Sequence, residues 1–535
     1  MALGNRDAPT PGRRLSRSSS PSVAIRVDSG AHIGGGHLLR CMTLAHELRG
    51  LGARVSFVSR EHPGHLLALL DDSGYVVHRL PAARLTVSKR ADHVAWLGVA
   101  QEQDVMDTVA VLRGQHIDWV VVDHYAIDAE WERLVREAVS GSVMVIDDLA
   151  DRTHDAALLL DQNYFGSETA GRYNRRVPVH CDRLLGPRYA LLQPSYKHLR
   201  QLLQRRSGTV ERILVYFGMH DPTRATLKVL QAMSCPELLP TAIDVVVGND
   251  PALLSEVRSA ARARPGITVH ETTPSLAELM ASADLAIGAG GATTWERACL
   301  GVPTIVATVA DNQVGLASAL AAEGFIALVG RSSSMSSHLW QVVLRQLLSE
   351  PERVVTLGNR AHELTDGHGA ARVARHMVGG AIAEVVLRRA RALDESLLLE
   401  WANDPETRHF AFNRAQIAAD QHHQWLLSRL ADASCVMLIG IDPHGLPLGQ
   451  VRFDLHSDRN EATINISVDV ALRGLGVGSV LLREAVATWR KQCPNTPIIA
   501  EVVVGNEASR RIFLAAGFTV TASRRSGTTT FESRI

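Results

Sequence analysis

Between residues 23 and 380, short apolar runs alternate with stretches that have the spacing of amphipathic helices. The apolar runs are continuous, as in WVVVD at 119–123. Such runs, separated by helices, are typical of parallel strands that are buried on both faces of a sheet. The pattern stops once, at the basic stretch 197–207, and then restarts. We therefore predict an α/β fold with two doubly wound domains, at 23–205 and 206–380, and a ligand cleft between them.

After about residue 380 the pattern changes. A strand-like and a helix-like segment are followed by segments in which apolar and polar residues alternate, such as GQVRFDLH at 449–456. This alternation is typical of antiparallel strands with one face in water, and it predicts a third, α+β domain at 384–535. Residues 1–22 are rich in arginine, serine and proline and lack the apolar core of a signal peptide, so we expect a disordered leader there.

The composition excludes several classes of function. Lysine plus arginine and aspartate plus glutamate both number 56, so no net field recruits nucleic acid or an anionic membrane. No apolar run is long enough to span a bilayer. The six cysteines form no Cys-x-x-Cys pair, which argues against disulfides or a zinc site and suits a reducing compartment. We expect a cytoplasmic protein with a small-molecule ligand and without nucleic-acid, membrane or metal partners, and a homo-oligomer stays open.

The first predicted strand is followed by three glycines, Gly34, Gly35 and Gly36, and then by His37. A strand, a glycine loop and a helix start together turn backbone N–H groups outward, where the helix dipole favours an anion. The histidine then lies on the first helical turn, at the mouth of the cleft. A tight turn with a histidine near the helix cap would explain the same residues.

A second loop of this kind occurs in the second half. Gly290 and Gly291 follow a predicted strand, and Thr293 and Thr294 begin a helix that carries Glu296 one turn later. The loop amides can hold a diphosphate, and the carboxylate can accept hydrogen bonds from ribose hydroxyls. A threonine cap with a capping-box glutamate would explain the last three residues without a ligand.

Two such loops, one in each half, resemble the nucleotide-sugar enzymes of the glycosyltransferase-B fold, whose C-terminal half carries a Gly-Gly-x-Thr-x-x-Glu signature for UDP. The N-terminal half is similar to the UDP-sugar hydrolase of pseudaminic acid biosynthesis in several motifs: R-x-D at 26–28, G-x-GH-x-x-RC at 34–41, DHY at 123–125, IDDLADR at 146–152, LLDQN at 159–163 and LLGPRYALLQPSY at 184–196. The resemblance covers roughly residues 23–380. It implies two Rossmann-like domains and an enzyme that splits UDP-2,4-diacetamido-2,4,6-trideoxy-β-L-altropyranose into the free sugar and UDP.

The resemblance also implies roles for individual residues. His37 becomes the general base that takes a proton from the attacking water, a role that imidazole suits near neutral pH. Asn312 matches a position that contacts the sugar. Four more residues are predicted to line the substrate site, beside the base or at the end of a strand: Asp28, Arg40, Asp123 and Tyr125. Ion pairing or packing would also explain these four.

The second half departs from the family at 217–222, which reads FGMHDP. The family shows Gly-Gly-Ser/Thr-Asp there, so Met219 adds bulk where a glycine lets the backbone approach the ligand, and His220 replaces a hydroxyl. This departure supports one rival interpretation, a non-catalytic nucleotide-sugar-binding scaffold. A second rival is a glycosyltransferase that moves the sugar from a UDP donor to an acceptor other than water, since the fold permits both.

In the third region, a predicted strand leads into RGLGVG at 473–478, at the start of an apolar helix. Bare amides at a helix start can cradle a pyrophosphate, although a glycine-rich turn alone would have this sequence too. With GNEASRRIFLAAGF at 505–518, these motifs resemble the GCN5-related N-acetyltransferases. The resemblance covers about 384–535 and implies acetyl-CoA as co-substrate, bound by Val468, Arg473, Gly474, Leu475, Gly476, Val477, Gly478, Ser479, Asn506 and Ser509.

A tyrosine that commonly protonates the departing thiolate in this superfamily is Phe513 here, which cannot donate a proton. Glu461 and Glu501 on neighbouring strands are candidate bases, although strand carboxylates are usually solvated. The acetyl acceptor is inferred from the neighbouring domains, because the hydrolase substrate is the 4-N-acetylated form of a UDP-4-amino sugar. Together the resemblances imply one chain that acetylates this UDP-sugar and then cleaves off UDP.

Overall fold

The computed structural model describes residues 20–82, 93–204, 206–219, 221–239, 241–248, 250–271, 275–379, 384–443 and 445–533. Residues 1–19 of the predicted leader, and His220, lie outside the described residues. Strand β1 begins at Ser22, whose backbone N–H donates a hydrogen bond to Asp118 Oδ2 at 2.8 Å. Over the described ranges, the helices include none that is long and apolar enough to cross a bilayer.

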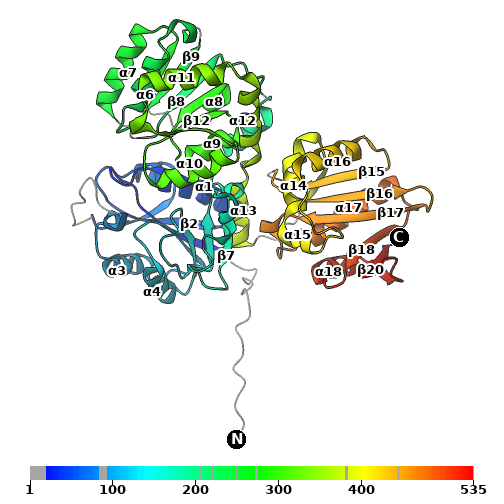
Figure 1. Ribbon diagram of the computed structural model, residues 1–535. Helices are drawn as coiled ribbons and strands as arrows, with labels where there is room; N and C mark the ends of the chain where they lie inside the picture. Colours follow the sequence, from blue (N-terminus) through cyan, green and yellow to red (C-terminus); the bar gives the residue numbers. More distant parts are fainter. Residues whose placement is uncertain are drawn as a thin grey trace.

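The first domain is a seven-stranded parallel sheet in the order β3-β2-β1-β4-β5-β6-β7 (Figure 1). Neighbouring residues of β1 face opposite sides: Ile25 packs with helix α1, and Ala24 packs with helices α3 and α4. Both faces are therefore covered, which is why the central strands β4 and β5 are almost entirely apolar. The elements are β1 (Ser22–Val27), α1 (Gly36–Gly50), β2 (Arg54–Arg60), α2 (Ala68–Asp72), β3 (Val76–Leu80), η1 (His93–Leu97), α3 (Gln101–Leu112), β4 (Trp119–Asp123), α4 (Ala129–Val139), β5 (Ser142–Ile146), β6 (Leu158–Asp161), η2 (Gly166–Gly171), β7 (Asp182–Leu185) and η3 (Pro187–Tyr189).

The second domain is a six-stranded parallel sheet in the order β10-β9-β8-β11-β12-β13. In both sheets the strand order reverses beside the first strand, between β1 and β4 and between β8 and β11. Ligands bind at such switch points, beyond the carboxyl ends of the strands. The elements are α5 (Pro194–Leu202), β8 (Arg212–Tyr216), α6 (Ala225–Ala232), η4 (Pro236–Leu238), β9 (Ala242–Val247), α7 (Pro251–Ala263), β10 (Ile267–Glu271), α8 (Ala277–Ser282), β11 (Leu285–Gly288), α9 (Thr293–Cys299), β12 (Thr304–Thr308), α10 (Asn312–Ala322), β13 (Ala327–Arg331), η5 (Ser332–Ser334), α11 (Ser337–Leu348) and α12 (Pro351–Glu363).

Helix α13 (Gly369–Val378) follows the second sheet in the chain but packs on the first domain. Val373 and Met377 belong to the apolar core beneath α1, and Trp119 Nε1 donates a hydrogen bond to the Met377 carbonyl at 2.9 Å. In Figure 1, α13 lies between the first domain and the third. The chain thus returns to the first domain before it enters the third.

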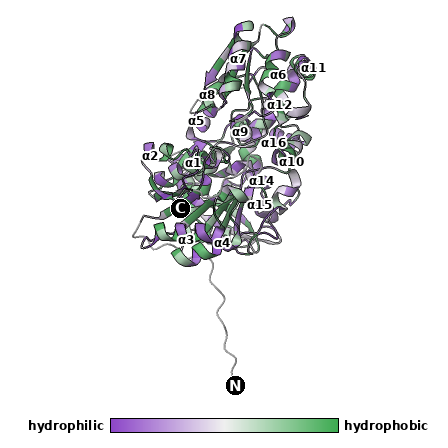
Figure 2. Cartoon of the chain, turned by 90° about the vertical axis from the view of Figure 1, so that its left-hand side faces the viewer, coloured by the Kyte–Doolittle hydropathy of each residue, from purple (hydrophilic) through white to green (hydrophobic). Residues whose placement is uncertain are grey.

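The third domain is a seven-stranded sheet in the order β14-β15-β16-β17-β18-β20-β19. All neighbours are antiparallel except β17 and β18, which are parallel. In Figure 2 the helices mix green and purple, as expected for helices with one buried face. The elements are β14 (Val386–Arg389), η6 (Ala392–Asp394), α14 (Glu395–Asn403), α15 (Pro405–His409), α16 (Ala419–Ala431), β15 (Cys435–Ile441), β16 (Pro447–His456), β17 (Glu461–Val468), η7 (Val470–Leu472), α17 (Val477–Gln492), β18 (Ile498–Val503), α18 (Glu507–Ala515), β19 (Thr519–Thr521) and β20 (Thr528–Ser533).

This architecture confirms the predicted fold class at the level of its sheets: two doubly wound, Rossmann-like α/β domains, followed by an α+β domain with a mixed sheet. The change from parallel to antiparallel pairing occurs where the sequence changes from continuous apolar runs to alternation.

A buried histidine in the first domain makes stability depend on pH. The side chain of His154 is 0% exposed, with Nδ1 2.7 Å from Glu132 Oε1 and Nε2 3.7 Å from Asp147 Oδ2. Burial alone would lower the pKa of His154, but these two carboxylates raise it to about 9. A raised histidine pKa stabilises the folded state fully below the unfolded pKa near 6.5, and this contribution disappears as pH rises through about 9.

We therefore expect His154→Gln to destabilise the protein by about 2–3 kcal/mol at pH 6 and by much less at pH 9.5. Thermal unfolding of both proteins at the two pH values measures this difference. Replacement of the exposed His180 by glutamine is the control and should leave the melting temperature unchanged at both. An equal loss at pH 6 and pH 9.5 would show that His154 is not held as a cation.

Candidate functional site

His37 and Asp123 meet at the switch point of the first sheet. Helix α1 begins at Gly36, so His37 lies on its first turn, and Asp123 is the last residue of the adjacent strand β4. His37 Nδ1 lies 2.6 Å from Asp123 Oδ1. Since an ionised carboxylate can only accept, Nδ1 carries the hydrogen, and in the neutral imidazole Nε2 is then the acceptor. The side chain of His37 is 11% exposed, so it is held in place yet reachable from solvent.

Arg40 keeps Asp123 ionised. Its Nε and Nη2 donate to the two oxygens of Asp123 at 2.6 and 2.7 Å, and its Nη1 donates to Asp148 Oδ2 at 2.7 Å. Burial alone would raise the pKa of Asp123, but Arg40 and His37 lower it well below its usual value. The carboxylate therefore orients the imidazole as an anion.

Two aromatic rings lie beside the imidazole of His37. The ring of Tyr125 meets His37 edge-on at 4.6 Å and donates a hydrogen bond from its hydroxyl to Asp148 Oδ2 at 2.7 Å. Trp96 stacks on Tyr125 at 5.7 Å between ring centroids. The sequence prediction did not include Trp96 or Asp148. Asp148 had a visible signal, because it lies in the motif IDDLADR at 146–152.

The structure places Asp28 inside the first domain. It is 0% exposed, and its carboxylate accepts hydrogen bonds from Arg26 Nη2 at 2.9 Å and from the backbone N–H of Arg60 at 2.7 Å. Burial alone would raise the pKa of Asp28, but Arg26 lowers it. These contacts correspond to the ion pair that the sequence also allowed for this residue.

The second glycine loop leads from β11 to α9. No side chain caps this helix, so the capping interpretation of Thr293 and Glu296 does not apply. Thr294 is buried and accepts a hydrogen bond from Arg297 Nη2 at 3.2 Å. Oε2 of Glu296 is buried without a hydrogen-bond partner among the described residues, and burial raises the pKa of this carboxyl group. A hydroxyl donor, such as that of a ribose, would satisfy this oxygen.

Gly290 and Gly291 of this loop lie against the start of α10. A Cβ on Gly290 would lie 3.6 Å from Gln313 Cβ, and one on Gly291 would lie 3.8 Å from Gln313 Nε2. Asn312 is exposed at the first position of α10. The loop amides and Asn312 are thus grouped at one end of the second domain.

Helix α10 also joins the second domain to the first. Leu316 and Leu320 pack with Ala190 of the first domain in one apolar cluster, and the ring of Phe165 approaches Gly315. Two residues before Phe165, Asn163 donates to Asp148 Oδ1 at 3.0 Å. A short chain of contacts therefore connects the start of α10 with the group around His37. Figure 1 shows α1 and α10 at the level where the two domains meet.

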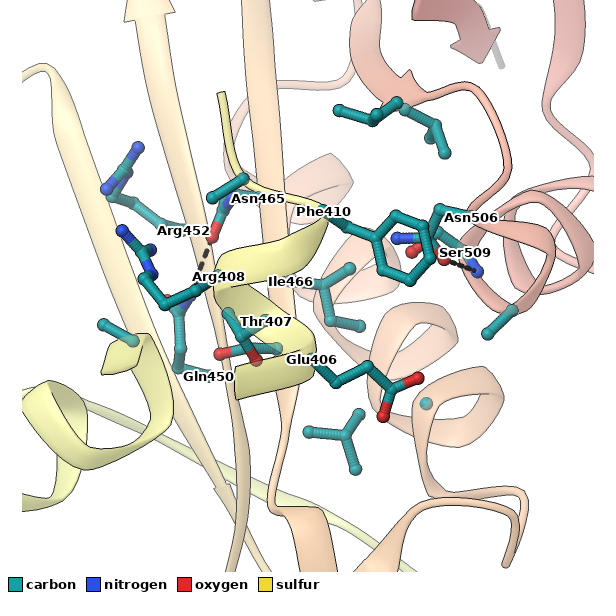
Figure 3. A pocket seen from close by; sticks show the side chains of 18 of the residues that line it. Glu406, Thr407, Arg408, Phe410, Gln450, Arg452, Asn465, Ile466, Asn506 and Ser509 are labelled. Atoms are coloured by element: carbon teal, nitrogen blue, oxygen red, sulfur yellow. Dashed lines mark hydrogen bonds between the residues drawn. The ribbon is translucent and has the colours of Figure 1, made fainter. Parts of the chain in front are cut away.

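The third domain contains a cavity of about 1020 Å³. Strands β17 and β18 pair only at Ala462–Ile498 and Thr463–Ile499 and then separate. The diverging parts, 464–468 and 500–503, line the cavity (Figure 3). Their facing backbone groups are not used in pairing between the two strands, so they are available to an extended ligand.

Nine of the ten predicted acetyl-CoA residues line this cavity. The exception, Leu475, packs against the domain core. Gly476 caps helix α17 with φ +80°, a backbone conformation that glycine adopts without strain. Arg473 pairs with Asp404 at 2.7 Å and Glu406 at 2.8 Å, so its charge is already compensated.

The opposite side of the cavity was not predicted. Figure 3 shows Arg408 and Arg452 across from Asn506 and Ser509, where the Asn506 side chain accepts a hydrogen bond from the Ser509 N–H at 3.0 Å. Asn506 is therefore the cap of α18. The sequence motifs predict a pyrophosphate loop at 473–478 but carry no signal for these arginines, which lie on other elements.

The two candidate bases lie in different places. Glu501 lines the cavity, as does Phe513. Glu461 does not, and it accepts a hydrogen bond from Arg524 at 2.6 Å. Within the described ranges, no group of three or more histidine, cysteine or acidic residues could hold a metal ion.

Comparison with known proteins separates the two parts of the chain. Residues 384–519 match the family described as Acetyltransferase (GNAT) domain. An uncharacterized protein of Methanocaldococcus jannaschii is 21% identical over 96% of this chain and 100% of its own length. The spore coat polysaccharide biosynthesis protein SpsG of Bacillus subtilis is 28% identical over 35% of this chain and 56% of its own length. The UDP-2,4-diacetamido-2,4,6-trideoxy-beta-L-altropyranose hydrolase of Campylobacter jejuni is 24% identical over 32% of this chain and 53% of its own length.

The chain thus spans about half the length of these last two relatives. Its C-terminal part is a GNAT acetyltransferase domain, and its N-terminal part is related to proteins of sugar biosynthesis.

Proposed function

We propose that the chain is a bifunctional enzyme of nucleotide-sugar metabolism. Its GNAT domain transfers an acetyl group from acetyl-CoA to the 4-amino group of UDP-4-amino-4,6-dideoxy-N-acetyl-β-L-altrosamine. Its Rossmann-like domains hydrolyse the product, UDP-2,4-diacetamido-2,4,6-trideoxy-β-L-altropyranose, to the free sugar and UDP. The observation that carries the hydrolase part is the His37–Asp123 pair at the switch point of the first sheet.

The hydrolytic step needs a base and a nucleotide holder. His37 Nε2 takes a proton from water while the water oxygen attacks the anomeric carbon. The bond between that carbon and the diphosphate oxygen breaks, and its electron pair leaves with UDP. A diphosphate is a good leaving group. Holding it on the amides of Gly290 and Gly291, with the ribose on Glu296, therefore supplies most of the remaining rate enhancement. Asn312 contacts the sugar from the second domain.

The acetyl transfer takes place in the cavity of the third domain. The loop at 473–478 holds the pyrophosphate of acetyl-CoA at the start of α17. The sugar amine attacks the thioester carbonyl, the C–S bond breaks and CoA leaves as a thiolate. Glu501 is the carboxylate in the cavity that can take the proton from the amine, directly or through a water. Because Phe513 has no hydroxyl group, the CoA thiolate takes its proton from solvent or from the attacking amine.

Hydrolysis in heavy-oxygen water tests the first activity. We expect the label on the anomeric hydroxyl of the released sugar, because water attacks carbon. Label on UDP would show attack at phosphorus and would contradict the assigned role of His37. Transfer of the sugar to an added acceptor would support a glycosyltransferase, and UDP-sugar binding without turnover would support a scaffold.

The order of the two reactions is tested with the 4-amino UDP-sugar. With acetyl-CoA present, we expect CoA release followed by UDP release. Without acetyl-CoA, UDP release should be slow, since the hydrolase site is proposed to take the acetylated sugar. Equal UDP release under both conditions would contradict this order.

A further inference from the structure

Asp469 fixes the start of the acetyl-CoA loop. It directly follows β17, and its Oδ1 accepts a hydrogen bond from the Ala471 N–H at 3.0 Å, which caps the short helix η7. Its own N–H donates to the Leu448 carbonyl at 3.0 Å. The loop at 473–478 begins immediately after η7. The position of Asp469 therefore sets where the loop leaves the sheet.

Two arginines from outside the GNAT domain hold the other oxygen of Asp469. Arg188 Nη2 donates to Asp469 Oδ2 at 2.8 Å, and Arg372 Nε donates to it at 3.3 Å. Arg188 lies in η3 of the first domain, and Arg372 lies on α13. From within the GNAT domain, Trp401 Nε1 donates to the same oxygen at 3.1 Å.

Further hydrogen bonds and ion pairs hold the side chains of the two arginines in this orientation. Arg372 donates to both oxygens of Asp366 at 2.7 and 2.6 Å and to the Arg188 carbonyl at 3.1 Å. Arg188 also pairs with Glu400 of α14, the helix whose residues Leu398 and Ala402 line the cavity.

The centre of the network, Arg372 and Asp469, is buried and stays charged. The side chains of Arg372 and Asp469 are 1% and 0% exposed. Burial alone would raise the pKa of Asp469, but Arg188 and Arg372 lower it. Removing one member would leave a buried charge without its partner, and an unpaired buried charge strongly destabilises the structure around it.

From this geometry we infer that Arg188 and Arg372 are positioning residues for the acetyl-CoA loop, so that the Rossmann-like part completes the acetyltransferase site. The inference rests on the proposed acetyl-CoA binding at 473–478. Neither arginine lines the cavity, so both act through Asp469 and not on the ligand.

The chain offers a matched control for simple domain docking. Arg375, one turn after Arg372 on α13, makes another buried ion pair with the GNAT domain, to Asp442. Asp442 follows β15, and neither it nor Arg375 lines the cavity. Loss of this pair weakens docking without touching the start of the loop.

Calorimetric binding of CoA to the full chain tests the inference. We expect Arg372→Met and the milder Arg188→Gln to weaken CoA binding about tenfold, with a matching rise in KM for acetyl-CoA. The kcat of UDP-sugar hydrolysis should stay within about twofold of the wild type in both variants, and Arg375→Met should bind CoA like the wild type.

The outcomes separate this inference from the proposed function. Equal weakening by Arg372→Met and Arg375→Met, or unchanged CoA binding in both Arg372→Met and Arg188→Gln, would overturn the positioning role. If Arg372→Met does not fold, Arg188→Gln alone decides. A wild-type protein that does not bind CoA would refute the proposed acetyl-CoA site, and this inference with it.

Discussion

Replacing His37 with alanine is expected to lower the kcat of UDP-sugar hydrolysis by about 10²- to 10⁴-fold, the contribution of a well-placed general base. The free Nε2 would be lost, while the amides and Glu296 that hold the nucleotide remain. KM for the UDP-sugar should therefore change little. UDP release measures the hydrolysis, and CoA thiol release should show acetyl transfer at the wild-type rate.

Two further variants make the result specific. His32→Ala removes an exposed histidine from the same loop and should leave hydrolysis unchanged. Asp123→Asn should lower kcat nearly as much as loss of His37, because an amide that donates to Nδ1 would place the ring proton on Nε2. Hydrolysis by His37→Ala at the wild-type rate would show that His37 is not the general base.

Replacing Gly478 with glutamate is expected to raise KM for acetyl-CoA about 10²-fold or more, because a carboxylate would face the pyrophosphate. Gly478 is the second residue of α17, and a Cβ there would make only ordinary contacts with Val468 and Ile512. An acidic residue in the first turn also interacts favourably with the helix dipole. The fold should therefore tolerate the change.

Gly478→Gln is the matched neutral variant. It has nearly the same size, so we expect a smaller rise in KM, about tenfold, from steric crowding alone. Hydrolysis should be unaffected in both variants. Equal effects of glutamate and glutamine would show that no anion binds at the start of α17, and a loss of hydrolysis would show that the two sites are not independent.

The sequence predicted members for a candidate site in the first domain but not their arrangement. His37, Arg40, Asp123 and Tyr125 were all predicted to line it, and the structure joins them in one group. The sequence could not show that Asp123 forms hydrogen bonds with both His37 and Arg40, because β1 and β4 become neighbours only when the sheet forms. Asp28, predicted from the R-x-D motif at 26–28, is buried beside Arg26.

In the third domain, the spacing of glycines was enough to predict the loop at the start of α17, because those residues are consecutive in the chain. The partners of that loop come from distant segments. Arg473 is paired with Asp404 and Glu406, and the loop's first anchor, Asp469, is held by Arg188 and Arg372. Local spacing carries no information about contacts between residues that are 97 or 281 positions apart.

The sequence by itself determined the class of each sheet and the positions of the glycine-rich loops before α1, α9 and α17, because side-chain periodicity and backbone freedom are local properties. The tertiary structure alone decided which charges meet. It placed α13 on the first domain, separated β17 from β18 to open the cavity, and brought ionised groups of η3 and α13 to Asp469 of the third domain. These outcomes depend on burial, which removes water from a charge and leaves only other parts of the folded chain to compensate it.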